Sequence, residues 1–481
     1  MCAGRRVTIN ILPNDVLLHI FLIDGQEYYE RQITSLGEDV DRVGLLRWRW
    51  HRLVHVCRRW RSIVFASPNY LDLRLVCGPM TPVELTSIWP PLPIIIMNSF
   101  FAINHKPEDY DFDAAIVHPN RVREIHLFHL TRSSLQRLAS AIRMQEQFPA
   151  LTHLNIHCLN GHPRDPPPAL PDGFLGGSAP LLRYIGLYRI PFPMLPKLLL
   201  SATHLVRLSL WGIPHSGYIS PEAIVTALAE MTHLESLFIN FDSSLSRPHR
   251  ESQRPRPSTR TVLPALTRFW FKGVSEYLED FVARIDATLL DSIYFTFIHQ
   301  LIFDIPQVAQ FMRRTSRFQE FKEVHVRFGH YGVLVETLPP TVTFDEKPRM
   351  RISCRELDWQ LSSMAQVITS FFPSIYIVEH LYIHDYRCQS RYDFEHMHWL
   401  ELFHPFSAVK NLYLSRKFAP YIATALHELV GGRTMEVLPS LRNIFLEGFQ
   451  LSEPIQEGIE RFVAARQLSD CPITVSRWER A

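Results

Sequence analysis

The stretches Leu205–Leu210 (LVRLSL) and Leu234–Ile239 (LESLFI) decide the fold class of this 481-residue chain. Each has apolar residues at its first, fourth and sixth positions, and the alternation at its end predicts a strand with one buried face. The first positions of successive copies lie 23 to 32 residues apart, with one gap of 57 that holds a degenerate copy at Met350, Ile352 and Cys354. The regular copies are Val122-Ile125-Leu127, Leu151-Leu154-Ile156, Leu182-Ile185-Leu187, Leu205-Leu208-Leu210, Leu234-Leu237-Ile239, Leu266-Phe269-Phe271, Leu290-Ile293-Phe295, Phe321-Val324-Val326, Val378-Leu381-Ile383, Val409-Leu412-Leu414 and Leu441-Ile444-Leu446.

Helical patterns separate these strand cores, for example Ile224, Leu228 and Met231 behind an N-cap at Ser220 and a first-turn proline at Pro221. Alternating strands and helices predict an α/β fold with a parallel sheet, and short stacked units curve such a sheet into a horseshoe. A repeat of this length and pattern is typical of leucine-rich repeats. An ordinary doubly wound α/β domain is the alternative, and it predicts fewer strands with longer apolar runs.

The repeats depart from the usual leucine-rich pattern at one position. The Asn or Cys that normally follows the third leucine by three residues is replaced by apolar residues, so we expect an irregular solenoid. These residues are Leu130, Leu159, Ile190, Ile213 and Val274.

The N-terminal part is predicted to be helical. Between Trp50 and Leu71, Leu53, Trp60 and Val64 recur at helical spacing with Cys57, which predicts one amphipathic helix with its arginines in water.

Pro13 occupies the expected first position of an earlier helix. Val16, Leu17, Ile20 and Phe21 form the apolar face of that helix. Two such short helices need a partner to bury their apolar faces.

The motifs Leu12-Pro13, Ile20-Phe21 and Val56-Cys57-Arg58-Arg59-Trp60 resemble an F-box, the helical module that docks onto the Skp adaptor of cullin-based ubiquitin ligases. The resemblance implies Skp binding through Leu12, Pro13, Ile20, Val56, Cys57 and Trp60. Pro13 and Val56 are 43 residues apart, roughly twice the usual separation, because residues 24–42 form a polar insertion. A helical hairpin that caps a larger domain is the alternative.

The whole chain resembles fungal F-box proteins with irregular leucine-rich repeats. The expected organisation is an F-box-like domain at 8–72, a connector at 73–120, and a repeat domain at 121–481 with a disordered loop at 243–260 and a C-terminal cap. The resemblance implies a non-catalytic substrate adaptor, with a cullin and an unidentified protein substrate as further partners. An F-box scaffold outside a ligase and an enzyme of unfamiliar type are the alternatives.

The composition favours a soluble, reduced protein. Charged residues make up 20% of the chain, the formal net charge is +2, and the seven cysteines include no C-x-x-C pair. The apolar run 92–103 is too short to span a bilayer, and no secretory signal is evident. We therefore expect a cytoplasmic or nuclear protein, with no membrane or nucleic-acid partner.

No familiar catalytic or phosphate-binding motif is present, and we predict no cofactor, no metal and no catalytic residue. His384 and Cys388 lie in a histidine-rich segment at 380–404, where a zinc site is conceivable, but no ligand pair repeats. The arginine- and tryptophan-rich stretch at 47–61 is better explained by a helix with a buried apolar face than by nucleic-acid binding.

One residue in each predicted strand, between the second and third apolar positions, is expected to point out of the concave face. From the middle repeats onward most of these residues are aromatic, as in many protein-binding surfaces. We predict that Phe238, Trp270, Tyr294, His325, Tyr382 and Tyr413 bind the substrate. The alternative is that they pack under an inserted loop or the C-terminal tail. The full row is His126, Asn155, Gly186, Ser209, Phe238, Trp270, Tyr294, His325, Tyr382, Tyr413 and Phe445.

Overall fold

The chain of the computed structural model divides into two compact units, residues 1–186 and 187–481. The structure describes residues 9–33, 49–78, 90–98, 116–143, 147–159, 168–242, 259–298, 303–315, 321–329, 332–338, 349–353, 357–372, 375–386, 397–429, 433–448 and 453–479. The predicted disordered loop at 243–260 lies outside the described residues, except for its last two positions.

The first unit begins with helices and continues into parallel strands. Strands β1, β2, β3 and β4 pair in that order, each parallel to the next. Its elements are α1 (Asn14–Ile33), α3 (Arg49–Val56), α4 (Arg58–Ala66), β1 (Leu75–Cys77), β2 (Ile94–Met97), β3 (Val122–Leu130), α7 (Arg132–Arg143) and β4 (His153–Cys158), with short 3-10 turns at Ile9–Ile11, Pro119–Arg121 and Phe174–Gly177. Strand β5 (Tyr184–Tyr188) contains the boundary between the units.

The second unit alternates strands with helices, as the repeat pattern predicts. Its first part holds α8 (Leu195–Leu199), β6 (Arg207–Ile213), a 3-10 turn at His215–Gly217, α9 (Pro221–Leu228), β7 (Ser236–Phe241), β8 (Thr261–Val262), β9 (Arg268–Gly273), α10 (Ser275–Val282), β10 (Ile285–Asp286), β11 (Ser292–Ile298) and α11 (Pro306–Arg314). Its second part holds β12 (Glu323–Gly329), β13 (Gly332–Leu338), β14 (Arg349–Ser353), α12 (Leu357–Phe371), a 3-10 turn at Ile375–Ile377, β15 (His380–Tyr386), α13 (Met397–Phe403), β16 (Asn411–Leu414), α14 (Ala419–His427), β17 (Asn443–Glu447), α15 (Glu453–Gln467) and β18 (Thr474–Trp478).

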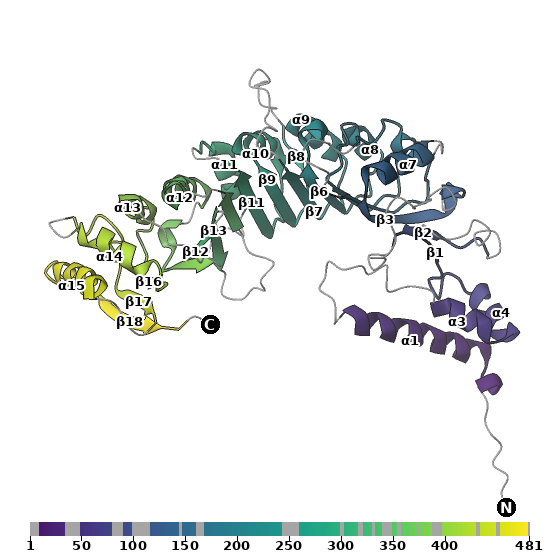
Figure 1. Cartoon of the computed structure of the whole chain (residues 1–481), viewed down its shortest axis with the longest axis horizontal. Helices are drawn as coiled ribbons and strands as arrows, with labels where there is room; N and C mark the ends of the chain where they lie inside the picture. The colour runs from purple at the N-terminus through teal and green to yellow at the C-terminus, as the bar shows by residue number, and fades with distance from the viewer. Residues whose placement is uncertain are drawn as a thin grey trace, which may run out of the picture. The chain divides into compact units, whose positions relative to one another are not determined.

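The predicted strand cores supply the buried layer between sheet and helices. Leu237, Phe269 and Ile293 are fully buried and aligned across β7, β9 and β11. The helices of this unit follow one another along one face of its sheet (Figure 1). Helix α9 begins as predicted, because the Ser220 hydroxyl accepts the Ala223 N–H at 3.2 Å and Pro221 occupies the first turn. The prediction of an α/β fold with a mostly parallel sheet is therefore confirmed.

The strand order in the middle of the second unit departs from the predicted order. Strand β12 does not follow β11; instead the order is β11, β14, β13, β12, β15, and β13 is antiparallel to both of its neighbours. The degenerate copy at 350–354 thus takes the place beside β11 that Phe321-Val324-Val326 was expected to occupy. A two-residue connection between Gly329 and Gly332 is short enough only for a hairpin, and this forces β13 to run antiparallel.

The N-terminal helices also differ from the sequence prediction. The single helix expected at 50–71 is broken into α3 and α4, because Cys57 has an extended backbone (φ −160°, ψ 169°). Helix α1 begins at Asn14, one residue after Pro13, and continues to Ile33, so the first part of the predicted 24–42 insertion is helical. The predicted connector at 73–120 contributes β1 and β2, because Ile94, Ile95 and Ile96 form a run buried on both faces.

Candidate protein-interaction surfaces

Helices α1 and α4 hold each other at the first predicted site. The Arg59 guanidinium donates to the Asn14 side-chain oxygen at 2.7 Å and to the Leu12 carbonyl at 2.5 Å. The rings of Phe21 and Trp60 lie 4.7 Å apart between centroids. Arg59 was expected to be solvated; it is half-buried and ties the start of α1 to α4, whereas Arg58 and Arg61 are exposed.

Cys57 caps α4 rather than lying inside a longer helix. Its sulfur accepts the Trp60 backbone N–H at 3.4 Å, and the Arg61 side chain donates to the Val54 carbonyl at 2.9 Å across the break. The six predicted docking residues therefore differ in exposure. Pro13, Ile20 and Val56 are exposed, and Leu12, Cys57 and Trp60 are half-buried.

More apolar side chains are exposed here than the predicted docking set contains; they lie in the 3-10 turn Ile9–Ile11, in α1 and at the end of α3. Val56 is 58% exposed and Ile11 is 66% exposed. The others are Ile9, Val16, Ile20 and Ile23. Large apolar side chains that gather on a surface mark contact sites for partners more often than isolated ones do. The packing of α1 against α4 thus leaves several apolar side chains of α1 exposed: Val16, Ile20 and Ile23.

The second predicted site lies in the larger unit, on the strand residues that alternate with the buried apolar layer. We call this side the open face. Phe238, Trp270 and Tyr294 are direct neighbours across β7, β9 and β11. Their rings contact one another, at 5.3 Å between Phe238 and Trp270 and 5.0 Å between Trp270 and Tyr294. All three are half-buried.

Two further aromatic residues join this group, and the repeat pattern missed them. Trp211 lies in a bulge of β6, with its ring 6.0 Å from that of Phe238 and 5.9 Å from that of Trp270. Tyr188 stacks on Trp211 at 5.9 Å. Gly212 follows Trp211 with φ +62°, a conformation that side chains other than glycine rarely adopt, and this permits the bulge.

The predicted row is interrupted by two ion-paired strands. Arg349 of β14 stands beside Tyr294, and Glu336 of β13 stands between Arg349 and His325. The Glu336 carboxylate lies 3.0 Å from Arg349 and 3.1 Å from Arg327. The aromatic residues therefore form two groups rather than one continuous row.

The second aromatic group is a stack of parallel rings. Tyr382 lies 4.2 Å from His325 and 4.1 Å from Tyr413, with interplanar angles of 5° and 9°. Phe445 continues the stack at 4.5 Å. Trp478 of β18 packs its edge against Tyr382 at 6.0 Å and Tyr413 at 5.6 Å, so the C-terminal strand covers part of this stack. Burial raises the pKa of Tyr382 well above its usual range, aided by the nearby Glu323 charge.

The histidine-rich segment does not assemble into a metal site within the part that the structure describes. His384 Nε2 instead lies 3.1 Å from His325 Nδ1, a hydrogen bond between imidazoles. Cys388 and His396 lie outside the described residues. No group of three potential metal ligands is found among the described residues.

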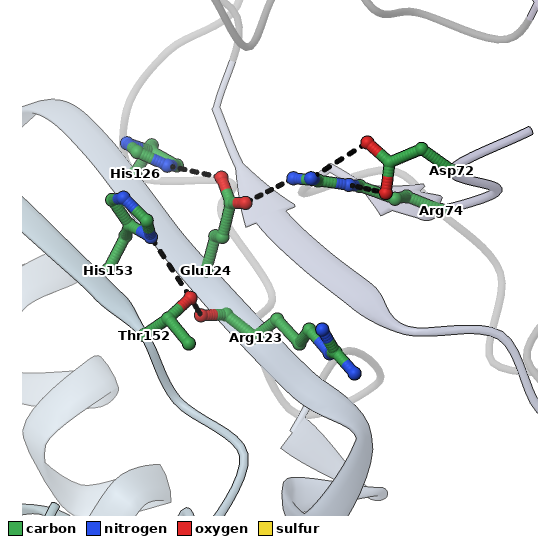
Figure 2. Close-up of polar contacts among 7 residues, drawn as sticks. All are labelled: Asp72, Arg74, Arg123, Glu124, His126, Thr152 and His153. Carbon is green, nitrogen blue, oxygen red and sulfur yellow. Dashed lines mark hydrogen bonds and ion pairs between the residues drawn. The ribbon is translucent and has the colours of Figure 1, made fainter. Parts of the chain in front are cut away.

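A buried polar chain in the smaller unit was not predicted (Figure 2). Glu124 of β3 accepts a hydrogen bond from Arg74, and Arg74 also pairs with Asp72 at 2.8 Å. His126 Nε2 lies 3.1 Å from the other Glu124 carboxylate oxygen. Burial raises the pKa of Glu124, but the His126 hydrogen bond and the Arg74 charge outweigh it, so the net pKa is lowered.

This chain of contacts ties the segment before β1 to β3. Glu124 and His126 are only 7% and 8% exposed. Within the described part of the chain, the His126 ring bonds to Glu124 and to no hydroxyl or thiol, so no activated nucleophile accompanies the pair. The alternation of apolar and polar residues along one strand cannot predict such a contact, because Arg74 and Glu124 lie 50 residues apart in the sequence.

Comparison with known proteins finds similar chains among the solved structures. No family model and no curated protein matches the chain. Among solved structures, the leucine-rich repeat-containing protein LegL7 from Legionella pneumophila is similar to 75% of this chain over 95% of its own length, with 14% identity and a TM-score of 0.27. In the described part of the chain, no helix is both long and apolar enough to cross a membrane.

Proposed function

We propose that this chain is a non-catalytic substrate adaptor of a Skp–cullin–F-box ubiquitin ligase, built from an F-box and irregular leucine-rich repeats. The N-terminal helices would dock the Skp adaptor, and the open face of the repeats would hold a target protein. The exposed apolar side chains of α1 and α3 carry the proposal, because Ile20 and Val56 are 40% and 58% exposed at predicted docking positions. Exposed apolar side chains that form a contiguous patch mark protein-interaction sites.

The chemistry of such a ligase requires no catalytic group in the adaptor. Holding a target beside a ubiquitin-charged enzyme raises the effective concentration of the target lysines. The chain would thus need two separate protein-binding surfaces and no cofactor. The exposed apolar helices and the aromatic open face supply candidates for both.

Co-purification of the full chain with the Skp adaptor tests the docking proposal. The variant Ile20→Glu/Val56→Glu places two charges on exposed side chains, so its melting temperature should match that of the wild type while adaptor binding is lost. Leu468→Glu is the matched control, because Leu468 is 90% exposed in the other unit. A folded wild type that fails to retain the adaptor would overturn the proposal and favour a helical cap.

Co-purification of a cullin through the adaptor separates a ligase component from a scaffold that acts outside a ligase. A complex that retains the adaptor and excludes the cullin would favour the scaffold. The Leu12→Ala/Pro13→Ala variant provides a second test of the predicted docking motif.

The target-binding role of the open face is tested by replacing Trp270, Tyr294 and Tyr382 with Ala. The proposal expects reduced capture of a bound target with a smaller effect on adaptor binding. Unchanged target binding together with a lowered melting temperature would show that these rings serve packing alone.

A further inference from the structure

A small cavity opens on the open face of the larger unit. It measures about 60 Å³ and lies among the rings of Trp211, Phe238, Trp270 and Tyr294. Asn240, Lys272 and Thr296 supply the polar part of its lining. An engineered cavity that holds a benzene ring measures about 150 Å³. This cavity therefore fits a small aliphatic side chain and excludes a nucleobase.

The strand register places cationic side chains on both sides of the aromatic group. Arg268 precedes Trp270 by two residues on β9, in the cross-strand row with Ser236 and Ser292. On the other side, Lys272 and Arg351 share a row with Thr296 between them.

These cations have no anionic partner within the described part of the chain: no ion pair involves Arg268, Lys272 or Arg351 there. The open-face positions of β7, β9, β11 and β14 carry no carboxylate. On the neighbouring strand β13, Glu336 is already paired with Arg327 and Arg349.

One polar atom in the cavity wall lacks a hydrogen-bond donor within the described part of the chain. The side-chain oxygen of Asn240 is buried and has no hydrogen-bond partner among the described residues. A buried acceptor without a partner costs about 1–3 kcal/mol, and a backbone N–H of a bound segment would satisfy it. This part of the open face thus combines a cavity lined by aromatic rings, a hydrogen-bond acceptor without a donor, and cationic side chains on both sides.

We propose that this surface, formed by Trp211, Phe238, Trp270 and Tyr294 with Arg268, Lys272 and Arg351, binds an extended acidic protein segment. A small aliphatic side chain of that segment enters the cavity, and its flanking carboxylates pair with the cations on either side. The inference rests on the proposed role of the open face in target binding and gives the target its chemical class. Charge complementarity across such an interface sets which partners are accepted.

Fluorescence anisotropy with the full chain and short labelled peptides tests this inference. The probe has a central valine between runs of glutamate, and the comparison peptides carry glutamine in place of glutamate or glycine in place of valine. The glutamate–valine peptide should bind at least about tenfold more tightly than either, and its affinity should fall with added salt.

Charge reversal provides the specific control. Lys272→Glu/Arg351→Glu should weaken binding of the glutamate peptide by at least about tenfold and gain binding to a lysine version of it. Lys197→Glu/Arg442→Glu makes the same change in net charge at exposed positions outside this surface and should leave peptide binding intact. Equal binding of the glutamine peptide, or tighter binding of single-stranded oligonucleotide that is lost in the same variant, would overturn the inference.

The adaptor test keeps the two proposals distinct. Lys272→Glu/Arg351→Glu should still co-purify with the Skp adaptor, because the F-box-like helices are unchanged. Adaptor binding together with equal affinities for the glutamate and glutamine peptides would reject the acidic-segment inference alone. Peptide discrimination without adaptor binding would reject the ligase role alone.

Discussion

The Glu336 carboxylate lies 3.0 Å from the Arg349 guanidinium, at the point where an antiparallel strand enters an otherwise parallel series. Glu336 is only 6% exposed and also pairs with Arg327. The three charges fill the gap between the two aromatic groups of the open face. This ion-paired cluster separates one potential binding surface from the other.

Removing the central carboxylate should destabilise the larger unit. Glu336→Gln leaves two partly buried guanidinium groups without their anion, and we expect a loss of about 2–3 kcal/mol in the free energy of unfolding. Urea unfolding of the variant measures it. Glu436→Gln, which breaks the exposed pair with Arg433, is the control and should leave the unfolding midpoint unchanged. A midpoint in Glu336→Gln equal to that of the wild type would mean that the cluster contributes nothing to stability.

His157 should make stability depend on pH. Burial lowers its pKa to about 3, with contributions from nearby His129 and His126, whereas an unfolded histidine titrates near 6.5. Between these values the unfolded state binds the extra proton, so stability falls as pH decreases from about 6.5 toward about 3, at up to about 1.4 kcal/mol per pH unit.

The variant His157→Phe should flatten this dependence. Phenylalanine carries no proton and retains a ring beside Phe128, whose centroid lies 4.6 Å from that of His157. Thermal unfolding between pH 7 and pH 5 compares the variant with wild type and with His204→Phe, a histidine that stacks on His233. Parallel pH profiles for wild type and His157→Phe would contradict the prediction.

Arg59 should be required for the arrangement of α1 against α4. Arg59→Lys keeps the charge but cannot reach both the Asn14 side chain and the Leu12 carbonyl with one planar group. We expect faster amide hydrogen exchange in the first turns of α1 and weaker adaptor binding. Arg58→Lys, at an exposed neighbouring position, serves as the comparison. Unaltered exchange in Arg59→Lys would assign the contact no role in holding α1.

Trp478 should stabilise the C-terminal end of the sheet by covering the ring stack. Its indole N–H donates to the Leu414 carbonyl at 3.4 Å, while its ring packs on Tyr382, Tyr413 and His384. Trp478→Ala should lower the free energy of unfolding by about 2 kcal/mol and increase the accessibility of Tyr382 to iodination. Unchanged stability and iodination in Trp478→Ala would show that the strand end does not cover the stack.

The spacing of apolar residues determined the local structure of this chain. Leu205–Leu210 and Leu234–Ile239 contain the first residues of β6 and β7, and the intervening pattern with Ser220 and Pro221 fixes where α9 begins. Such signals are local: they depend on the side-chain period and on backbone donors within one turn. The cap at Cys57 is also a local interaction. Cys57 recurs at helical spacing with the apolar residues around it, however, and this pattern hid the break between α3 and α4.

Only the tertiary structure decided which strands are neighbours and which side chains remain accessible. The period places a strand at 323–329 but cannot say that β13 and β14 come between it and β11. Trp270 and Tyr382 occupy equivalent positions in their repeats, yet one lines a cavity and the other lies beside Trp478. Strand pairing and surface coverage depend on contacts between distant residues, and a repeating pattern of apolar letters carries no information about those partners.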